Sequence, residues 1–275
     1  MTRQKLPIII GGFYRSGTSL VRRLLDSHSN ISCGPEVKFF RDFFGDFIKD
    51  DLAHARFFRT VRSLGLDEAE CLKIFGQAFI ACHQLAASKL NKARWADKSP
   101  ENVLYLDQWK QLLPDGFIFI HVVRNPYDSL ASLKEIGFPK AVPAGLEAKV
   151  ALYLKYARMG IEFCNANPDS SITLAYEDLV RHPKDVLTNV LQKLGEPFES
   201  EMLDKFHLAE RRPGLEDPKV SERKDIHIQS IGRWRDILTA DEQNLIRREL
   251  LELPLDSSGE WKLTCWISAV GLKPK

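Results

Sequence analysis

Residues 6–19 read Leu-Pro-Ile-Ile-Ile-Gly-Gly-Phe-Tyr-Arg-Ser-Gly-Thr-Ser, and this stretch decides the fold. The β-branched run at 8–10 is apolar on both faces, which is typical of a parallel strand covered by helices. Gly12 and Gly17 have the spacing of a Walker A loop, whose backbone N–H groups close around a phosphate at a helix N-terminus. The stretch therefore predicts a strand, a phosphate-binding loop and a helix.

Thr18 stands where a Walker A loop carries lysine. That lysine reaches the β- and γ-phosphates in nucleoside triphosphatases, so its absence argues against hydrolysis of ATP or GTP. The anion-binding backbone is retained, and Arg15 is the basic residue inside the loop. Taken by itself, the loop could also be a strand-to-helix turn without a ligand.

Residues 117–132 repeat the pattern of strand followed by helix. Phe-Ile-Phe-Ile-His-Val-Val predicts a second buried strand, and Asn125 after it is a good helix N-cap. Arg124 then lies at the carboxyl edge of the sheet, with Ser132 about two helical turns farther along. Ligands of open α/β sheets bind at this edge, so we expect Arg15 and Arg124 to face one crevice and to bind a ligand with two separated phosphates.

Arg-Ser-Gly-Thr-Ser after one strand, and arginine followed eight residues later by serine after another, resemble the nucleotide signature of sulfotransferases. The donor in that family is 3′-phosphoadenosine 5′-phosphosulfate (PAPS). The resemblance implies that the first loop binds the 5′-phosphosulfate and the second motif the 3′-phosphate. The residues that correspond are Arg15, Ser16, Gly17, Thr18 and Ser19 in the loop, and Arg124 and Ser132 in the second motif.

Leu-Asp-Ser-His at 25–28 and Cys-Gly-Pro-Glu at 33–36 resemble the branch that contains tyrosylprotein sulfotransferases and many bacterial homologues. The resemblance implies that Glu36 is the general base. Tyrosylprotein sulfotransferases carry another acidic residue at the position of Pro35 and arginine at that of Lys38. We therefore expect a small molecule, glycan or lipid as the hydroxyl-bearing acceptor, rather than a protein tyrosine. A carboxylate that only stabilises a helix start is the alternative for Glu36.

Trp-Ala-Asp-Lys-Ser-Pro-Glu-Asn at 95–102 resembles the family's loop whose lysine contacts the donor near the sulfate. This implies that Lys98 stabilises the charge that develops on the bridging oxygen, with no metal ion. A solvated loop lysine and a helix N-cap at Ser99 are the structural alternatives. Tyr176 and Arg233 are further candidates for the donor site, because 173–180 and 230–234 resemble nucleotide-proximal segments of the family. A core position is equally compatible with Tyr176.

The predicted fold is a three-layer α/β/α domain over residues 1–275 with a mainly parallel central sheet and the sulfotransferase order of motifs. A long core helix is expected within 67–92, and Thr239 with Glu242 predicts a capping box at the start of a helix over 239–251. The polar stretch 211–221 is interpreted as a segment that folds over the site. The apolar positions expected to form the core stripe of the long helix are Leu72, Phe75, Phe79, Ile80 and Leu85.

The chain has 275 residues, 44% hydrophobic and 28% charged, with a net charge of +2. These values are typical of a soluble globular protein and give no indication of nucleic-acid or membrane binding. The five cysteines form no Cys-x-x-Cys pair, which favours the cytoplasm. Residues 1–5 are polar and run into the first strand, so we expect neither a signal peptide nor a membrane span. No metal is expected, and the oligomeric state is not predicted.

The function predicted from these patterns is transfer of a sulfuryl group from PAPS to a hydroxyl. A P-loop kinase is one alternative, which Mg²⁺-dependent ATP turnover would favour. A noncatalytic nucleotide-binding protein is the other, which donor binding without transfer would favour.

Overall fold

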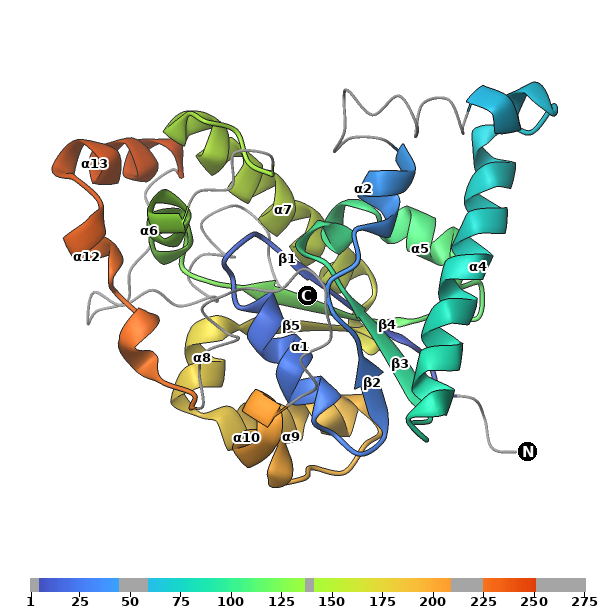
Figure 1. Cartoon of the computed structure of the whole chain (residues 1–275). Helices are drawn as coiled ribbons and strands as arrows, with labels where there is room; N and C mark the ends of the chain where they lie inside the picture. Colours follow the sequence, from blue (N-terminus) through green and yellow to red (C-terminus); the bar gives the residue numbers. More distant parts are fainter. Residues whose placement is uncertain (1–4, 45–58, 137–140, 209–224, 251–275) are drawn as a thin grey trace.

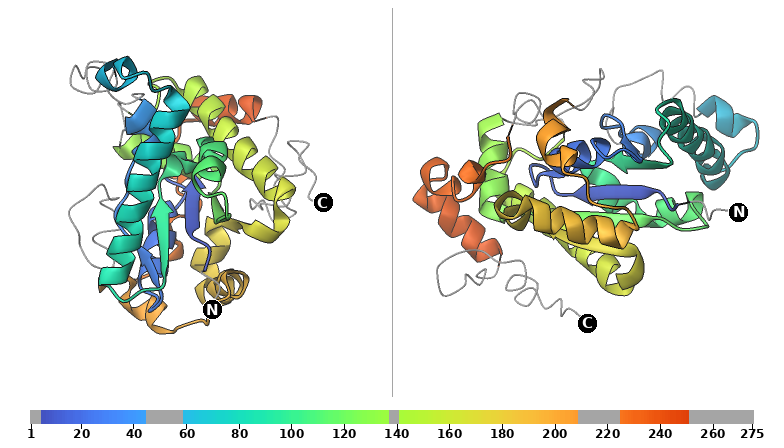
Figure 2. Two further views of the ribbon diagram at one scale, coloured as in Figure 1. Left: turned by 90° about the vertical axis from the view of Figure 1, so that its right-hand side faces the viewer. Right: turned by 90° about the horizontal axis from the view of Figure 1, so that it is seen from below.

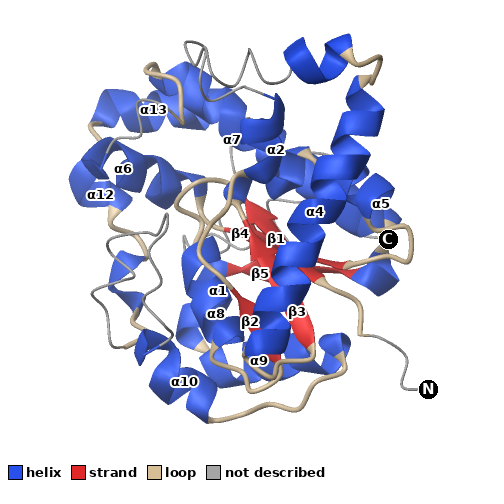
Figure 3. Ribbon diagram, turned by 45° about the vertical axis from the view of Figure 1, so that its right-hand side comes forward, coloured by secondary structure: helices blue, strands red, loops and turns tan. Residues whose placement is uncertain are grey.

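A computed structural model describes residues 5–44, 59–136, 141–208 and 225–250 of the chain. A 5-stranded sheet in the order β2-β3-β1-β4-β5 lies at its centre, and every pair of neighbouring strands is parallel. Figure 3 shows this sheet surrounded by helices. The predicted α/β fold is confirmed. The strands are β1 (Ile8–Gly12), β2 (Ile31–Cys33), β3 (Arg94–Lys98), β4 (Ile118–Val123) and β5 (Ser171–Ala175).

Successive residues of β1 enter two separate apolar clusters, one on each face of the sheet. Ile8 and Ile10 pack with α1 (Thr18–Asp26), α8 (Tyr176–Arg181) and α9 (Pro183–Leu194), whereas Ile9 packs toward the opposite helices. This alternation follows from the two-residue period of a strand. The result is three layers (Figures 1 and 2). The helices of the second face include α4 (Glu68–Lys89), α5 (Leu106–Leu112), α6 (Pro126–Ile136), α7 (Leu146–Ala166) and α13 (Ala240–Glu249).

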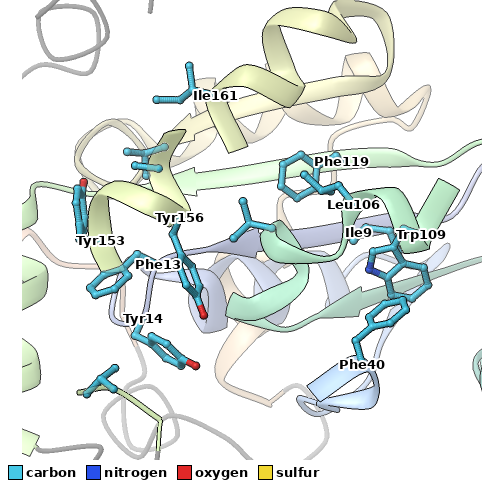
Figure 4. Close-up of a cluster of buried hydrophobic side chains, with 14 of the residues drawn as sticks. Ile9, Phe13, Tyr14, Phe40, Leu106, Trp109, Phe119, Tyr153, Tyr156 and Ile161 are labelled. Atoms are coloured by element: carbon cyan, nitrogen blue, oxygen red, sulfur yellow. The ribbon is translucent and has the colours of Figure 1, made fainter. Parts of the chain in front are cut away.

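The phosphate-loop candidate is anchored to the second face by aromatic packing (Figure 4). The ring of Phe13 meets those of Tyr14, Tyr153 and Tyr156 edge to face, with centroids 5.8, 5.0 and 5.7 Å apart. Such pairs contribute about 0.5–1.5 kcal/mol each beyond the area that they bury. The loop after β1 is therefore held against α7 rather than left as a free turn.

The segment that we expected to be a loop around Lys98 is the inner strand β3. Its sequence, Arg-Trp-Ala-Asp-Lys, carries three charged residues, yet all its positions are buried. Each charge has a partner: Arg94 donates to the Leu194 carbonyl at 2.7 Å, Asp97 accepts from the Asn102 amide at 2.8 Å, and Lys98 forms an ion pair with Glu36. Buried charges are tolerated when they are paired in this way.

The two helices predicted from the sequence are present, but not every residue in them has the predicted role. In α4, Leu72 and Ile80 are buried, but Leu85 is 57% exposed and is not part of the core as predicted. The capping box of α13 is confirmed, since the Thr239 hydroxyl and the Glu242 carboxylate each accept from the other residue's N–H. Ser99 precedes a 3₁₀ helix without capping it through its side chain.

No helix in the described ranges is long and apolar enough to cross a membrane. The stretch 211–221, interpreted above as a cover for the site, lies outside the described residues. Shortly after Glu36 the chain forms α2 (Phe39–Phe44).

Candidate active site

Each strand of the sheet delivers a candidate site group close to its carboxyl end, as expected for parallel α/β sheets. The order of these groups along the sheet edge follows the strand order β2-β3-β1-β4-β5 and not the sequence. Sites assembled in this way draw together residues far apart in the chain. From one edge of the sheet to the other the groups are Glu36, Lys98, the loop Phe13–Gly17, Arg124 and Tyr176.

The loop after β1 has a backbone that leaves room for an anion. Arg15 and Gly17 both have positive φ, at 64° and 96°. A Cβ on Gly17 would lie 2.3 Å from Cδ2 of Tyr176, so the absence of a side chain allows the aromatic ring to pack on the loop. Gly17 is also the N-cap of α1 and makes no side-chain capping bond. The first N–H groups of α1 thus have no side-chain cap, which is the arrangement that binds phosphate in such loops.

The two halves of the nucleotide signature are in direct contact. Arg15 donates through Nε to the Ser132 hydroxyl at 3.1 Å, and Arg124 donates through Nη1 to the Arg15 carbonyl at 2.8 Å. They line one cleft that is open to solvent. The predicted residues that line it are Arg15, Gly17, Arg124, Ser132, Tyr176 and Arg233.

Tyr176 and Arg233 both reach this cleft, but in different ways. The Tyr176 ring lies under the Arg124 guanidinium, 4.6 Å from its centroid, and its hydroxyl shares a 2.6 Å hydrogen bond with the Ser230 hydroxyl. Tyr176 is therefore both a core aromatic and a cleft residue. Arg233 pairs at its Nη2 with the Glu135 carboxylate at 2.6 Å, and its side chain is 40% exposed at the rim.

Glu36 and Lys98 form a hydrogen-bonded ion pair beside the first turn of α1. The Lys98 ammonium also donates to the Ser19 hydroxyl at 3.2 Å, and its side chain is almost fully buried. A second lysine, Lys38, lies 2.9 Å from the other oxygen of Glu36. The candidate base, the candidate lysine and the end of the phosphate loop are thus neighbours.

Ser16 in the loop and Thr18 at the start of α1 are buried and do not line the cleft. The Ser16 hydroxyl has no hydrogen-bond partner among the described residues. The same is true of the Nε of Arg124. Unsatisfied buried donors are rare in folded proteins, and donors at this loop are suited to an anion.

Two buried carboxylates that the sequence reasoning missed fix the rim of the cleft. Asp128 accepts from the N–H groups of Gly232 and Trp234, at 2.8 and 3.1 Å, and so ties the segment of Arg233 to α6. Glu177 accepts from the Asn125 N–H at 2.9 Å. Burial raises the pKa of Glu177 to about 7, against the opposing effects of this hydrogen bond and of Arg124. Both carboxylates lie inside motifs quoted above, but neither has a spacing that would have indicated its role.

A third missed carboxylate is Glu101, on the base side of the site. It lies in a 3₁₀ helix (Pro100–Leu104) and accepts hydrogen bonds from the side chains of Tyr14, Lys38, Arg41 and Ser99. Among the described residues, no group of three or more His, Cys, Asp or Glu side chains could hold a metal ion. The arrangement provides arginines and hydroxyls for a phosphorylated ligand, and a carboxylate paired with lysines at which a proton can be accepted.

Comparison with protein families gives a match to the model described as "Sulfotransferase family" over residues 7–200. Among curated proteins, a putative protein-tyrosine sulfotransferase of Caenorhabditis briggsae is 25% identical over 245 residues, which cover 85% of this chain and 82% of that protein. The match spans all five strands and the candidate residues up to Tyr176.

Among solved structures, the sulfotransferase domain of the olefin synthase of Synechococcus PCC 7002 has a TM-score of 0.63 at 21% identity, covering 92% of this chain and 98% of that one. A mouse sulfotransferase, SULT7A1 complexed with PAP, has a TM-score of 0.50 at 13% identity, covering 94% and 88%. At these identities the likeness is one of fold.

Proposed function

The chain belongs to the sulfotransferase family, and we propose that it transfers a sulfuryl group from PAPS to the hydroxyl of an acceptor. One observation carries the choice of donor. The contacts of Arg15 with Ser132, and of Arg124 with the Arg15 carbonyl, bring both halves of the nucleotide signature into one cleft. That cleft adjoins the Glu36–Lys98 pair through the first turn of α1.

The residues present fit a donor that carries an anion at each end of the cleft. The loop Arg15–Ser19 and the N-terminus of α1 would bind the 5′-phosphosulfate, since Gly17 at positive φ turns the chain into α1 and the first N–H groups of α1 have no side-chain cap. Arg124 and Ser132 would bind the 3′-phosphate, with Tyr176 and Arg233 at the same rim. PAP is the product of this donor, and the mouse neighbour complexed with PAP supports PAPS as the donor.

In the proposed reaction Glu36 takes the proton of the acceptor hydroxyl as the acceptor O–S bond forms. The bond between sulfur and the bridging oxygen breaks, and PAP leaves. Lys98 donates to that bridging oxygen, where negative charge accumulates. Because Lys98 is paired with Glu36, its ammonium has to exchange that partner for the donor. The exchange would release Glu36 at the moment when a base is needed.

The acceptor is proposed to be an alcohol on a small molecule, a glycan or a lipid. Pro35 and Lys38 replace residues of the tyrosylprotein enzymes, which is the reason for this choice. The named relatives nevertheless make a tyrosine peptide a necessary arm of any acceptor screen. The cytoplasmic location and the single-domain organisation stay predictions.

The first experiment measures thermal unfolding with PAP and, separately, with ADP and Mg²⁺. A ligand at 100 times its Kd stabilises the folded state by about 2.7 kcal/mol. We expect PAP to raise the unfolding temperature of the protein and ADP with Mg²⁺ to leave it unchanged. Stabilisation by ADP with Mg²⁺ alone would favour a kinase and overturn the proposal.

The second experiment follows transfer from radiolabelled PAPS to a panel of alcohols and a tyrosine peptide. Glu36→Gln should lower turnover on the order of 10²-fold and leave PAP affinity unchanged. Arg124→Ala should weaken PAP binding by about 1.5–3 kcal/mol, with little effect on a donor that lacks the 3′-phosphate. Arg62→Ala, an exposed arginine paired with Glu68, is the matched control and should change neither. PAP binding without transfer to any acceptor would instead indicate a noncatalytic nucleotide-binding protein.

A further inference from the structure

Glu101 is a buried carboxylate, 3% exposed, at the centre of a polar network. Its Oε1 accepts from the Tyr14 hydroxyl at 2.5 Å, from the Lys38 ammonium at 2.7 Å and from Nη1 of Arg41 at 2.8 Å. Its Oε2 accepts from the Ser99 hydroxyl at 2.6 Å. Charge-assisted hydrogen bonds of this kind are about twice as strong as neutral ones, so this carboxylate holds its neighbours firmly.

The partners of Glu101 come from separate parts of the active site. Tyr14 belongs to the phosphate loop after β1, Lys38 and Arg41 to the segment that carries the candidate base, and Ser99 to the segment that carries Lys98. One side chain thus joins the three segments that meet at the reacting centre.

Lys38 bridges the two carboxylates of the network. Its ammonium lies 2.7 Å from Oε1 of Glu101 and 2.9 Å from Oε1 of Glu36. The position of Lys38 between them decides how strongly it pairs with Glu36. A carboxylate pulled into a tighter ion pair is a slower proton acceptor, because its lone pairs are engaged and its negative charge is stabilised.

We propose that Glu101 is a positioning residue for sulfuryl transfer, which acts through Lys38 to orient Glu36 and to keep it basic. The inference rests on the proposed function. Glu101 draws the Lys38 ammonium away from Glu36 and supplies a negative charge that offsets Lys38 and Arg41. Without that charge, the electrostatic potential at Glu36 becomes more positive. Of the two carboxylates, only Glu36 then remains to pair with the Lys38 ammonium.

The protonation states within the network agree with this role. Burial opposes ionisation of Glu101, but Lys38 and the hydrogen bonds of Lys38, Ser99 and Tyr14 lower its pKa to about 2, so it stays an anion at any assay pH. Burial and then the charge of Glu101 raise the pKa of Tyr14, so its hydroxyl keeps its proton and donates.

Glu196 provides a matched control for the loss of a buried, paired carboxylate. It is 5% exposed and pairs with Lys5 at 2.6 Å and with Arg94 at 3.4 Å. Arg94 begins β3 whereas Lys98 ends it, so this pair lies at the opposite edge of the sheet from the active site. Glu196→Gln therefore costs stability without touching the base.

The test compares Glu101→Gln with Glu196→Gln in steady-state transfer from PAPS, from about pH 5.5 to about pH 9. We expect Glu101→Gln to lower kcat roughly 10- to 50-fold, as misplacement of a reacting group does, with the Kd of PAP changed less than about twofold. The acid limb of its pH profile should move to lower pH, because the carboxylate form of Glu36 is stabilised. Glu196→Gln should keep the wild-type kcat and profile. Equal losses of kcat and PAP affinity in Glu101→Gln, or an unmoved acid limb, would overturn the inference.

A double-mutant cycle tests whether the effect passes through Lys38. In the background of Lys38→Met, the further change Glu101→Gln should alter kcat less than about twofold, whereas additive losses would contradict a path through Lys38. Glu101→Asp keeps the charge and serves if Glu101→Gln does not fold; it should lower kcat with the acid limb in its wild-type place. If the wild type transfers nothing from PAPS, the proposed function fails. If the wild type transfers the group and either Glu101→Gln or the folded Glu101→Asp has the same kcat, the role of Glu101 is wrong while the proposed function stands.

Discussion

Gly17→Ala should damage both stability and donor binding, through two separable effects. Gly17 has φ +96°, a conformation that L side chains rarely adopt. The added Cβ would also meet Cδ2 of Tyr176 at 2.3 Å, far inside van der Waals contact. The ring has no easy way to retreat, since its hydroxyl is bonded to Ser230 and its face is covered by Arg124.

The magnitude can be built from these two terms. A left-handed backbone costs an L residue about 1–2 kcal/mol, and forcing an extra methyl group into a packed site costs about 1–3 kcal/mol. The sum is roughly 2–5 kcal/mol, or a fall in Tm on the order of 10 °C for a chain of this size. Displacement of Tyr176 also disturbs Arg124, so we expect the Kd of PAP to rise on the order of 10-fold or more.

Gly195→Ala separates the two terms. Gly195 caps α9 with φ +69°, but a Cβ there would meet no atom within 4 Å. Its substitution should therefore cost only the backbone term, about 1–2 kcal/mol, with unchanged PAP affinity. Urea unfolding and calorimetric titration with PAP measure both quantities. Equal destabilisation by the two substitutions, with PAP affinity intact in Gly17→Ala, would refute the packing of Tyr176 on the loop.

Three further predictions concern the rim of the donor cleft. Burial raises the pKa of Glu177 from 4.5 to about 7, although the Asn125 N–H and Arg124 act in the opposite direction. The protonated carboxyl therefore contributes its full stability below about pH 4.5, and this contribution is lost as the pH rises through 7. In urea unfolding, the stability of the wild type should therefore fall by roughly 2–3 kcal/mol relative to that of Glu177→Gln between pH 5 and pH 8, and parallel curves would contradict this. Tyr176→Phe removes the hydrogen bond to Ser230 and should cost about 1 kcal/mol in stability and about fivefold in PAP affinity. Urea unfolding and calorimetric titration measure these quantities, and no change in either would argue against a role for this hydrogen bond. Asp128→Ala leaves the Gly232 N–H without its acceptor, so hydrogen exchange at that amide should accelerate on the order of 10-fold, and an unchanged rate would show that the contact is not formed in solution.

The centre of the sheet and its site edge could be predicted because their residues carry strong local patterns. Both β1 and β4 are uninterrupted apolar runs, and both run into a helix start marked by glycine or by Asn125. Parallel strands end at one edge of the sheet, so the meeting of Arg15 with Arg124 follows from the strand assignment.

Features that depend on distant partners could not be predicted. The charges of β3 resemble those of a loop because Glu196 and Glu36, which pair with Arg94 and Lys98, lie far away in the sequence. The helical period of α4 does not tell which face of the helix is covered, so the sequence predicts a core position for Leu85 although its side chain is exposed. Glu101 has no periodic signature at all, since its partners converge only in the folded chain.

The strand order divides the work of the site between two halves of the sheet. β1 lies in the middle, with β2 and β3, which lead to Glu36 and end at Lys98, on one side, and β4 and β5, which lead to Arg124 and Tyr176, on the other. The outer strand of the first half, β2, is only 3 residues long and has the base immediately beyond it. Because β2 is the outer strand, insertions and substitutions beside it would alter the surroundings of Glu36 and leave β4 and β5, which lead to Arg124 and Tyr176, in place. Under the proposed function, relatives of this chain that differ in acceptor would therefore differ mainly around β2, while Arg124 and Tyr176 at the other side of the sheet stay the same.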